Sequence, residues 1–278
     1  MSAQGLICPL CGSPLLLVGR ALRCPKGHSF DLAKEGYAHL LPVQKKRTKD
    51  PGDSREMVAA RARFLEAGHY QVFADTLAQL CVQVAQQQKK PLYLLDLGCG
   101  EGYYDRAIAQ AMRQKGLAFE LIGLDISKAA VRRAAQLAPE HCTYVVGSSF
   151  AAPVQAGWAD LVLNVFAPFA REESLRVLRS GGGLIYAVPG PRHLFGLKEV
   201  LYDAPYENPT QQVEYPGFAD AGVVEAQGQI RAEGEAVQDL FCMTPYYWKT
   251  PREGAERLAQ CQAVETPIQF RFLRFIKE

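Results

Sequence analysis

Four residues near the N-terminus have the types and the spacing of a metal site. Cys8 and Cys11 form a Cys-x-x-Cys pair, and a second pair, Cys24 and His28, follows after twelve intervening residues. Three thiolates and one imidazole, arranged in two close pairs, are a typical ligand set for a closed tetrahedral zinc site. Because this set leaves no coordination position open, we expect the Zn2+ to be structural and not catalytic.

Other chemistry for these cysteines fits the surrounding sequence less well. A redox dithiol normally begins a helix, whereas both pairs here lie in Pro- and Gly-containing turns. A zinc deaminase would need a His-x-Glu triplet upstream of its cysteine pair, and none precedes Cys8. Residues 15–22 are predicted to form a hairpin that returns the second pair to the first. A module this small buries too little surface to fold unaided, so the metal is expected to hold it together.

A second chemical group is the glycine-rich loop Gly98-Cys99-Gly100-Glu101-Gly102. It follows a short apolar segment, 92–97, and precedes a helix-length segment, 103–114. Three glycines at a strand-to-helix turn let the backbone pass close to a ligand at the sheet edge. The next predicted strand, 120–124, ends in Asp125, which is placed to accept hydrogen bonds from ribose hydroxyls. We therefore predict that cofactor binding involves Gly98, Gly100, Gly102 and Asp125.

A nicotinamide dinucleotide and S-adenosylmethionine both require this loop geometry, and the charges around the loop distinguish between them. A pyrophosphate binder typically shows Gly-x-Gly-x-x-Gly, whereas this loop reads Gly-x-Gly-x-Gly, with Asp96 before it and Glu101 inside it. Two carboxylates would repel a pyrophosphate but attract the sulfonium and ammonium groups of S-adenosylmethionine. We predict S-adenosylmethionine as the cofactor, with a dinucleotide-dependent oxidoreductase as the alternative.

The substrate is expected at the same edge of the sheet. Asn164, Phe166 and Phe169 lie where the fourth predicted strand ends, and the two aromatic rings are suited either to stack on a flipped base or to pack in the core. After the fifth strand, the loop 189–194 presents Arg192 and His193. The residue that would accept a proton from the substrate is not assigned, and His193 and the nearby acids are the candidates.

These groups need a sheet and helices to position them, and the sequence predicts both. Short apolar strands alternate with helix-length segments from residue 92 onward, which is typical of a doubly wound α/β domain. We predict an α/β fold, namely a Rossmann-like S-adenosylmethionine-dependent methyltransferase sheet preceded by a small zinc-binding module. The expected division is a zinc module for RNA recognition at 1–45, a basic linker and helix at 46–80, and the methyltransferase domain at 81–278. Expected strands lie at 92–97, 120–124, 143–146, 161–165 and 183–188. The alternating segment around 268–272 is expected to finish the sheet as an antiparallel strand. Expected helices lie at 55–67, 103–114 and 236–241.

Composition and charge narrow the class of protein. Apolar residues make up 48% and charged residues 22% of 278 residues, as in a soluble globular chain, and no apolar stretch reaches the roughly 20 residues of a membrane span. With no signal peptide at the start, we expect a cytoplasmic protein with reduced cysteines. Residues 1–70 hold eleven basic and six acidic residues, a net charge of +5. The basic stretch 45–49, with Arg61 and Arg63, suits phosphate contact, although an exposed linker explains that stretch equally well.

Taken together, these motifs resemble one known family, the bacterial A-type 23S ribosomal RNA guanine-N1 methyltransferases, which modify a guanine in hairpin 35. The 745-type subfamily is favoured over the 748-type. At Phe166 and Phe169 the chain departs from the tyrosine and cysteine expected in relatives. The resemblance spans the chain and rests on Cys8-Pro9-Leu10-Cys11, Phe30-Asp31, Ala33-Lys34-Glu35-Gly36-Tyr37, Leu40-Leu41-Pro42-Val43-Gln44, Asp50-Pro51-Gly52-Asp53-Ser54, Ala67-Gly68-His69-Tyr70, Gly98 to Tyr104, Pro189 to Leu194 and Met243-Thr244-Pro245.

The resemblance implies particular sites and partners. It implies zinc at Cys8, Cys11, Cys24 and His28, and cofactor contacts at Tyr70, Gly100, Glu101, Gly102 and His193. It also implies a homodimer whose zinc modules contribute to an RNA-binding cleft. The function expected is methyl transfer from S-adenosylmethionine to N1 of a guanine in hairpin 35 of 23S ribosomal RNA. Alternatives are a methyltransferase for another RNA or a small metabolite, and a non-catalytic RNA-binding scaffold.

Overall fold

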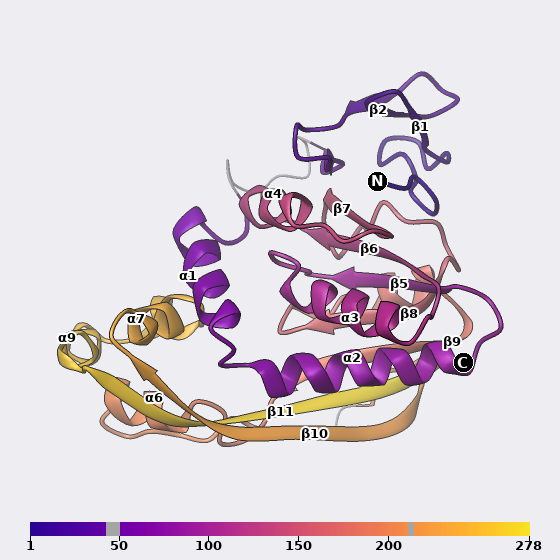
Figure 1. The fold of residues 1–278 in the computed structure, drawn as a ribbon. Helices are drawn as coiled ribbons and strands as arrows, with labels where there is room; N and C mark the ends of the chain where they lie inside the picture. The colour runs from indigo at the N-terminus through magenta and orange to yellow at the C-terminus, as the bar shows by residue number, and fades with distance from the viewer. Residues whose placement is uncertain (43–50, 211–213) are drawn as a thin grey trace.

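An eight-stranded sheet and a separate three-stranded ribbon organise the chain (Figure 1). The computed structural model describes residues 1–42, 51–210 and 214–278. The large sheet contains β4 (Ala38–His39), β5 (Leu92–Leu97), β6 (Phe119–Asp125), β7 (Cys142–Val146), β8 (Ala159–Val165), β9 (Leu178–Pro189), β10 (Phe218–Glu233) and β11 (Ala263–Lys277). Its strand order is β10-β11-β9-β8-β5-β6-β7-β4. The predicted α/β fold class is confirmed.

The strand order reverses beside β5. From β5 the chain moves outward to the parallel strands β6 and β7, and it then returns to add β8 and β9 on the other side of β5. Ligands of open α/β sheets bind at the carboxyl ends of the strands at such a switch point. The glycine-rich loop that follows β5 lies at this point, as the sequence predicts.

The helices predicted at 55–67, 103–114 and 236–241 all form, and the described residues also contain helices that were not predicted. The helix at 103–114 has the predicted bounds, and the side chains of Ser54 and Ser127 cap two other helices by accepting hydrogen bonds from the backbone N–H groups of Met57 and Ala130. The helices are α1 (Arg55–Glu66), α2 (Gln71–Gln86), α3 (Tyr103–Gln114), α4 (Lys128–Gln136), α5 (Arg171–Val177), α6 (Phe195–Leu201), α7 (Glu235–Cys242), α8 (Tyr246–Lys249) and α9 (Arg252–Gln260). No described helix has the length and apolar character needed to cross a membrane.

Both faces of β5 are buried, each in a different core cluster. Leu94 packs with apolar residues of α2 and α3, whereas Leu95 and Leu97 belong to the second cluster. This second cluster also contains Leu6 and Leu22 of the N-terminal module. The module is therefore packed onto the large sheet and shares its core.

The N-terminal ribbon consists of β1 (Leu16–Val18), β2 (Ala21–Arg23) and β3 (Ser29–Asp31), which pair in that order. The hairpin predicted at 15–22 is confirmed, because β1 and β2 are antiparallel neighbours. The chain then forms β4, which pairs with β7 at the edge of the large sheet. Figure 1 shows the ribbon (indigo) lying beside this edge. The predicted domain boundaries at 45 and 80 stay a prediction, and the basic stretch 45–49 lies outside the described residues.

The C-terminal strands differ from the expectation in one respect. The alternating segment around 268–272 was expected to finish the sheet, but β11 lies inside it, between β9 and an edge strand, β10, that was not predicted. The alternation itself is confirmed, because Ile268, Phe270 and Phe272 are buried. The sequence of β10 contains glycines and charged residues and lacks a clear apolar face, as its mostly exposed pattern reflects.

Candidate functional site

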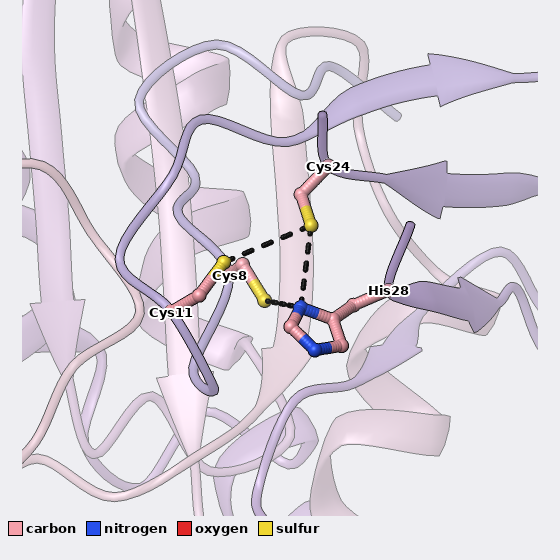
Figure 2. A group of neighbouring side chains, drawn as sticks. All are labelled: Cys8, Cys11, Cys24 and His28. Carbon is pink, nitrogen blue, oxygen red and sulfur yellow. Dashed lines mark hydrogen bonds between the residues drawn. The ribbon is translucent and has the colours of Figure 1, made fainter. Parts of the chain in front are cut away.

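The four N-terminal ligand candidates converge in the structure (Figure 2). One ligand atom from each of Cys8, Cys11, Cys24 and His28 lies within 4.8 Å of the others. The Nδ1 atom of His28 is 3.4 Å from the Sγ atoms of both Cys8 and Cys24, and the Sγ atoms of Cys11 and Cys24 are 3.8 Å apart. Two thiolates that share a tetrahedral zinc at about 2.3 Å are roughly 3.8 Å apart, so this donor set fits Zn2+.

Two tight turns present these ligands. In the first turn the Gly12 N–H donates to the carbonyl of Cys8, and in the second the Gly27 N–H donates to the carbonyl of Cys24. Both glycines have positive φ values, 71° and 87°, which other residues adopt only at a cost. The Ser13 hydroxyl and backbone lower the pKa of the Cys11 thiol to about 6, which favours the thiolate that a metal needs.

The glycine-rich loop is held between the ends of β5, β6 and β8. The N–H groups of Gly98 and Cys99 both donate to the carbonyl of Leu124, at 2.8 and 3.1 Å. A β-carbon on Gly98 would lie 2.7 Å from that of Ala167, and one on Gly102 would lie 2.8 Å from the Tyr144 hydroxyl. These two positions therefore require glycine for space as well as for their positive φ values.

Asp125 ties the loop to the next helix. Its Oδ2 atom accepts a hydrogen bond from the Gly100 N–H at 3.0 Å, and its Oδ1 atom accepts one from the Ser127 N–H at 2.7 Å. Burial raises the pKa of this carboxyl, while the two backbone hydrogen bonds lower it. The half-buried carboxylate lies at the carboxyl end of β6 beside the glycine loop, where a ribose contact is predicted.

Glu101 is a buried acid with an incomplete set of partners. Its side chain is 2% exposed, and its Oε2 atom has no hydrogen-bond partner among the described residues. The nearest cation is Arg61, whose Nη1 atom is 3.9 Å away and whose Nη2 atom is 2.5 Å from the Asp53 carboxylate. Burial raises the pKa of Glu101, and Arg61 partly opposes this. A buried, unsatisfied carboxylate oxygen beside the loop fits a ligand with an ammonium group.

Sequence reasoning missed the role of Arg61. Arg61 and Arg63 were expected to add to the positive surface, but Arg61 pairs with Asp53 and Arg63 pairs with Asp239 of α7. Helix α1 thus joins the cofactor loop on one side to α7 on the other. The contacts of Arg61 with Glu101 and of Arg63 with Asp239 connect residues far apart in the sequence, so spacing gave no signal for them.

A second missed residue is Asp105, on the first turn of α3. It is 1% exposed and lies near Asp96 and Tyr144 under the glycine loop. Burial raises the pKa of Asp105 to about 6, and burial together with the Asp105 charge raises that of Asp96 well above its ordinary value. The raised pKa shifts Asp96 toward its neutral form, so this residue supplies less of the negative charge on which the sequence prediction relied. A signal was available, because Asp105 occupies the buried face of α3 with Ile108 and Met112.

Tyr70 and His193 meet on the other side of the loop. The Tyr70 hydroxyl is 3.3 Å from the Nε2 atom of His193, and the His193 Nδ1 atom accepts a hydrogen bond from the Gln269 N–H at 3.2 Å. Burial, with a smaller contribution from the Lys198 charge, lowers the pKa of His193 to about 3. Both ring nitrogens are thus engaged in a neutral imidazole, which is a poor candidate for the general base and a suitable support for Tyr70.

The two aromatic residues after β8 have different surroundings. Phe169 stacks on Tyr186 with ring centroids 5.0 Å apart and meets Tyr215 edge to face, which is core packing. Phe166 is 43% exposed and lies beside His193. Asn164 is fully buried and donates to the carbonyl of Pro168 at 3.3 Å. The predicted site residues thus gather around the loop after β5 and the neighbouring strand ends, apart from the four metal ligands in the ribbon.

Comparisons with known proteins match two parts of the chain to two family models. The family model "RlmA, N-terminal", a zinc ribbon, matches residues 6–49, and the model "Methyltransferase domain" matches residues 94–182. The predicted zinc and S-adenosylmethionine cofactors are confirmed at the level of these families. Among solved structures, the YcgJ protein from Bacillus subtilis aligns with a TM-score of 0.47 and 14% identity, covering 73% of this chain and 98% of that one.

Two curated relatives match over nearly the whole chain. The 23S rRNA (guanine(748)-N(1))-methyltransferase of Streptomyces fradiae is 34% identical over 265 residues, which cover 93% of this chain and 91% of the relative. A Micromonospora griseorubida protein, named provisionally as a 23S rRNA (guanine-N1)-methyltransferase, is 33% identical, with coverage of 95% and 92%. Such similarity includes both the ribbon and the sheet.

Proposed function

Because this chain belongs to the family of 23S rRNA (guanine-N1)-methyltransferases, we propose that it transfers a methyl group from S-adenosylmethionine to N1 of a guanine in 23S ribosomal RNA. The methyltransferase family match supports the reaction class. The relatives' names support the nucleic acid and the atom that is methylated.

The finer parts of the proposal rest on the sequence motifs. We propose a guanine in hairpin 35 as the target, a homodimer as the working form, and the cytoplasm, where ribosomal RNA is found, as the location. The motifs favour the 745-type position, whereas the Streptomyces fradiae relative carries 748 in its name. The position is therefore a matter for direct mapping.

The observation that carries the proposal is the attachment of the zinc ribbon to the cofactor edge of the sheet. β4 pairs with the carboxyl-terminal half of β7, the Leu40 N–H donates to the carbonyl of Val146, and the Ile7 N–H donates to that of Pro153. An RNA hairpin bound by the ribbon would therefore lie next to the strand ends that carry the glycine-rich loop. A methyltransferase for a small metabolite has no use for this second surface.

The residues of the chain have a clear division of labour in this reaction. When bound, S-adenosylmethionine supplies an electrophilic methyl group on a good leaving group. Glu101 would hold its ammonium group, Asp125 its ribose, and the backbone of Gly98 and Gly100 would allow close approach. Since the leaving group is already activated, positioning of the guanine supplies most of the rate. Guanine N1 lies on the Watson–Crick edge, so the base must be unpaired or flipped out.

Reverse transcription of 23S ribosomal RNA tests this function directly. RNA from cells with and without the gene would be compared, because an N1-methyl group blocks pairing and stops the polymerase. We expect a stop in hairpin 35 only when the gene is present, and the stop also gives the position. An unchanged pattern over the whole 23S molecule would reject the proposal.

Calorimetry with S-adenosylmethionine separates the remaining alternatives. A non-catalytic RNA-binding scaffold would give no heat of binding. A chain that binds the cofactor and methylates another RNA or a small metabolite would bind normally and yet leave 23S ribosomal RNA unmodified. We expect both cofactor binding and methylation of 23S RNA.

A further inference from the structure

Phe166 has a backbone conformation that its side chain does not favour. It follows the last residue of β8 and has a φ value of 52°, in the left-handed region where bulky residues are rare. His141 and Leu194 are the other non-glycine residues with positive φ in the described part of the chain. Such strain persists only when the surroundings impose it, and it is concentrated at functional sites.

The surroundings that impose it can be named. The Phe166 N–H donates to the carbonyl of Ala187 at 3.1 Å, and Asn164 closes the same turn by donating to the carbonyl of Pro168. The next residue, Ala167, leaves no space for a β-carbon on Gly98 of the cofactor loop. The turn that carries Phe166 is therefore fixed directly against the first glycine of that loop.

The ring itself is half supported and half exposed. It packs against Phe73 and Phe270 with centroid distances of 5.2 and 5.9 Å, and lies nearly parallel to the His193 ring at 6.3 Å. Even so, 43% of the residue is exposed, in contrast to the fully buried Phe73 beneath it. An aromatic ring that is held rigidly from below but left open to solvent has unused stacking surface.

From this arrangement we infer that Phe166 is the stacking platform for the guanine that receives the methyl group. The inference rests on the proposed function, since it requires a flipped guanine as substrate. Flipped bases are held by stacking on aromatic side chains, and each such contact contributes substantially to binding. The strained turn places the ring beside the cofactor loop, so that the stacked base lies next to the methyl donor. Phe169, in the same turn, takes no part because Tyr186 and Tyr215 cover it.

Three variants separate stacking from simple packing. Phe166→Tyr keeps the aromatic face, Phe166→Leu keeps an apolar side chain without it, and Leu137→Ala is the control. Leu137 lies at the C-terminal end of α4, away from the carboxyl ends of the parallel strands, and is 45% exposed. Methyl transfer to 23S RNA from cells that lack the gene would be measured for each variant, together with calorimetric affinity for S-adenosylmethionine.

We expect Phe166→Leu to lower kcat/KM for the RNA by about tenfold to a hundredfold, with cofactor affinity unchanged within about twofold. Phe166→Tyr and Leu137→Ala should stay within about threefold of wild type. A structural readout uses a hairpin with 2-aminopurine at the mapped target position. Its fluorescence should be quenched by wild type and by Phe166→Tyr, and should be brighter with Phe166→Leu.

Each other result overturns the inference in a recognisable way. Equal activity and equal quenching for Phe166→Leu would show that no base stacks there. Equal loss for Phe166→Tyr and Phe166→Leu, or a parallel loss of cofactor affinity, would show that the residue acts through packing. If wild type itself leaves 23S RNA unmethylated but binds the cofactor, the proposed function fails first and the stacked guanine fails with it.

Discussion

At Glu101, a carboxylate oxygen is buried without a hydrogen-bond partner among the described residues, and the closest cation remains 3.9 Å away. A buried carboxylate of this kind is energetically costly until a cation pairs with it. A bound ligand whose ammonium group reaches this oxygen would supply the missing hydrogen-bond donor. The same reasoning does not extend to His193, whose hydrogen bonds are already complete.

Replacement Glu101→Gln should weaken the binding of S-adenosylmethionine about tenfold or more, because it removes a charged hydrogen-bond acceptor. Isothermal titration calorimetry measures this change. The matched control is Glu120→Gln, at the opposite end of β6, where Glu120 contacts His141 at 3.0 Å. If Glu101→Gln and wild type bind S-adenosylmethionine with equal affinity, Glu101 does not contact the cofactor.

The buried His193 predicts a pH dependence of stability. Its pKa is about 3 in the folded chain and about 6.5 in an unfolded one, so the unfolded state binds more protons between these values. The stability from this neutral imidazole is complete above about pH 6.5 and is lost as the pH falls toward 3. Relative to His193→Gln, wild type should lose at most about 1.4 kcal/mol of unfolding free energy per pH unit. Denaturant titrations at pH 7, 6 and 5 check this, and parallel curves for the two proteins would contradict it.

Site residues were predictable where spacing along the chain carries the chemistry. The four metal ligands and the glycines of the cofactor loop follow from short motifs, as does Asp125 from its place after a strand. Arg61 was not predictable, because its partner Glu101 lies forty positions away and comes close only after α1 packs against α3 and α4. Phe166 was found as a candidate, but its positive φ is visible only in three dimensions.

At the scale of elements, α1 acts as a brace between two parts of the site. Arg61 reaches toward the cofactor loop, while Arg63 binds Asp239 of α7 with two hydrogen bonds, at 2.9 and 2.5 Å. The helix begins at a capped position, since the Ser54 side chain accepts a hydrogen bond from the Met57 N–H at 3.2 Å. The residue at which α1 begins sets the positions of Arg61 and Arg63, and therefore affects the contacts of both side chains.

Removal of the cap by Ser54→Ala should lower the free energy of unfolding by about 1 kcal/mol. In a chain of this size that corresponds to a fall in Tm of about 2–4 °C, which differential scanning calorimetry can resolve. Ser180→Ala, at an exposed position in β9, serves as the control and should leave Tm unchanged. A Tm for Ser54→Ala equal to that of the control would show that α1 does not depend on its cap.

The zinc ribbon is predicted to depend on its metal. Cys24→Ser removes one of the four ligands and should abolish stoichiometric zinc, as measured by elemental analysis of the purified protein. The ribbon should then lose protection from hydrogen exchange while β5 and β6 keep theirs. Cys261→Ser, at the half-buried end of α9, is the control that should retain zinc. Full zinc content in Cys24→Ser would exclude the four-ligand site.

At the scale of the whole molecule, the parallel sheet was predictable and its completion was not. Buried strands such as β5 can be recognised in a sequence as continuous apolar runs flanked by glycine, because helices or loops cover both of their faces. The edge strand β10 has mixed composition and forms only because β11 offers it a partner along fourteen registered positions. The pairing of β4 with β7 was equally unpredictable from the sequence, because a two-residue strand is too short to show an alternating pattern.

The ribbon should contribute to RNA affinity through exposed cations. Arg23→Gln combined with Lys26→Gln removes two of them from the ribbon. We expect weaker binding of 23S RNA, and a slope of log affinity against log salt that is shallower by about two. Filter binding at several salt concentrations measures both, while S-adenosylmethionine affinity should not change.

The matched control for this change is Arg113→Gln with Lys115→Gln, at the exposed C-terminal end of α3. This end of α3 lies away from the cofactor edge at which the helix begins. The control removes the same charge, so an equal loss of affinity and slope in both double variants would mean that RNA responds to net charge and not to the ribbon.

The two-residue strand β4 also has a protective consequence. It occupies the open side of β7, whose backbone would otherwise be a template for another chain. Because β4 directly follows the ribbon, metal depletion would release it and uncover that template. A cell short of zinc would then face aggregation of this protein as well as unmodified ribosomes.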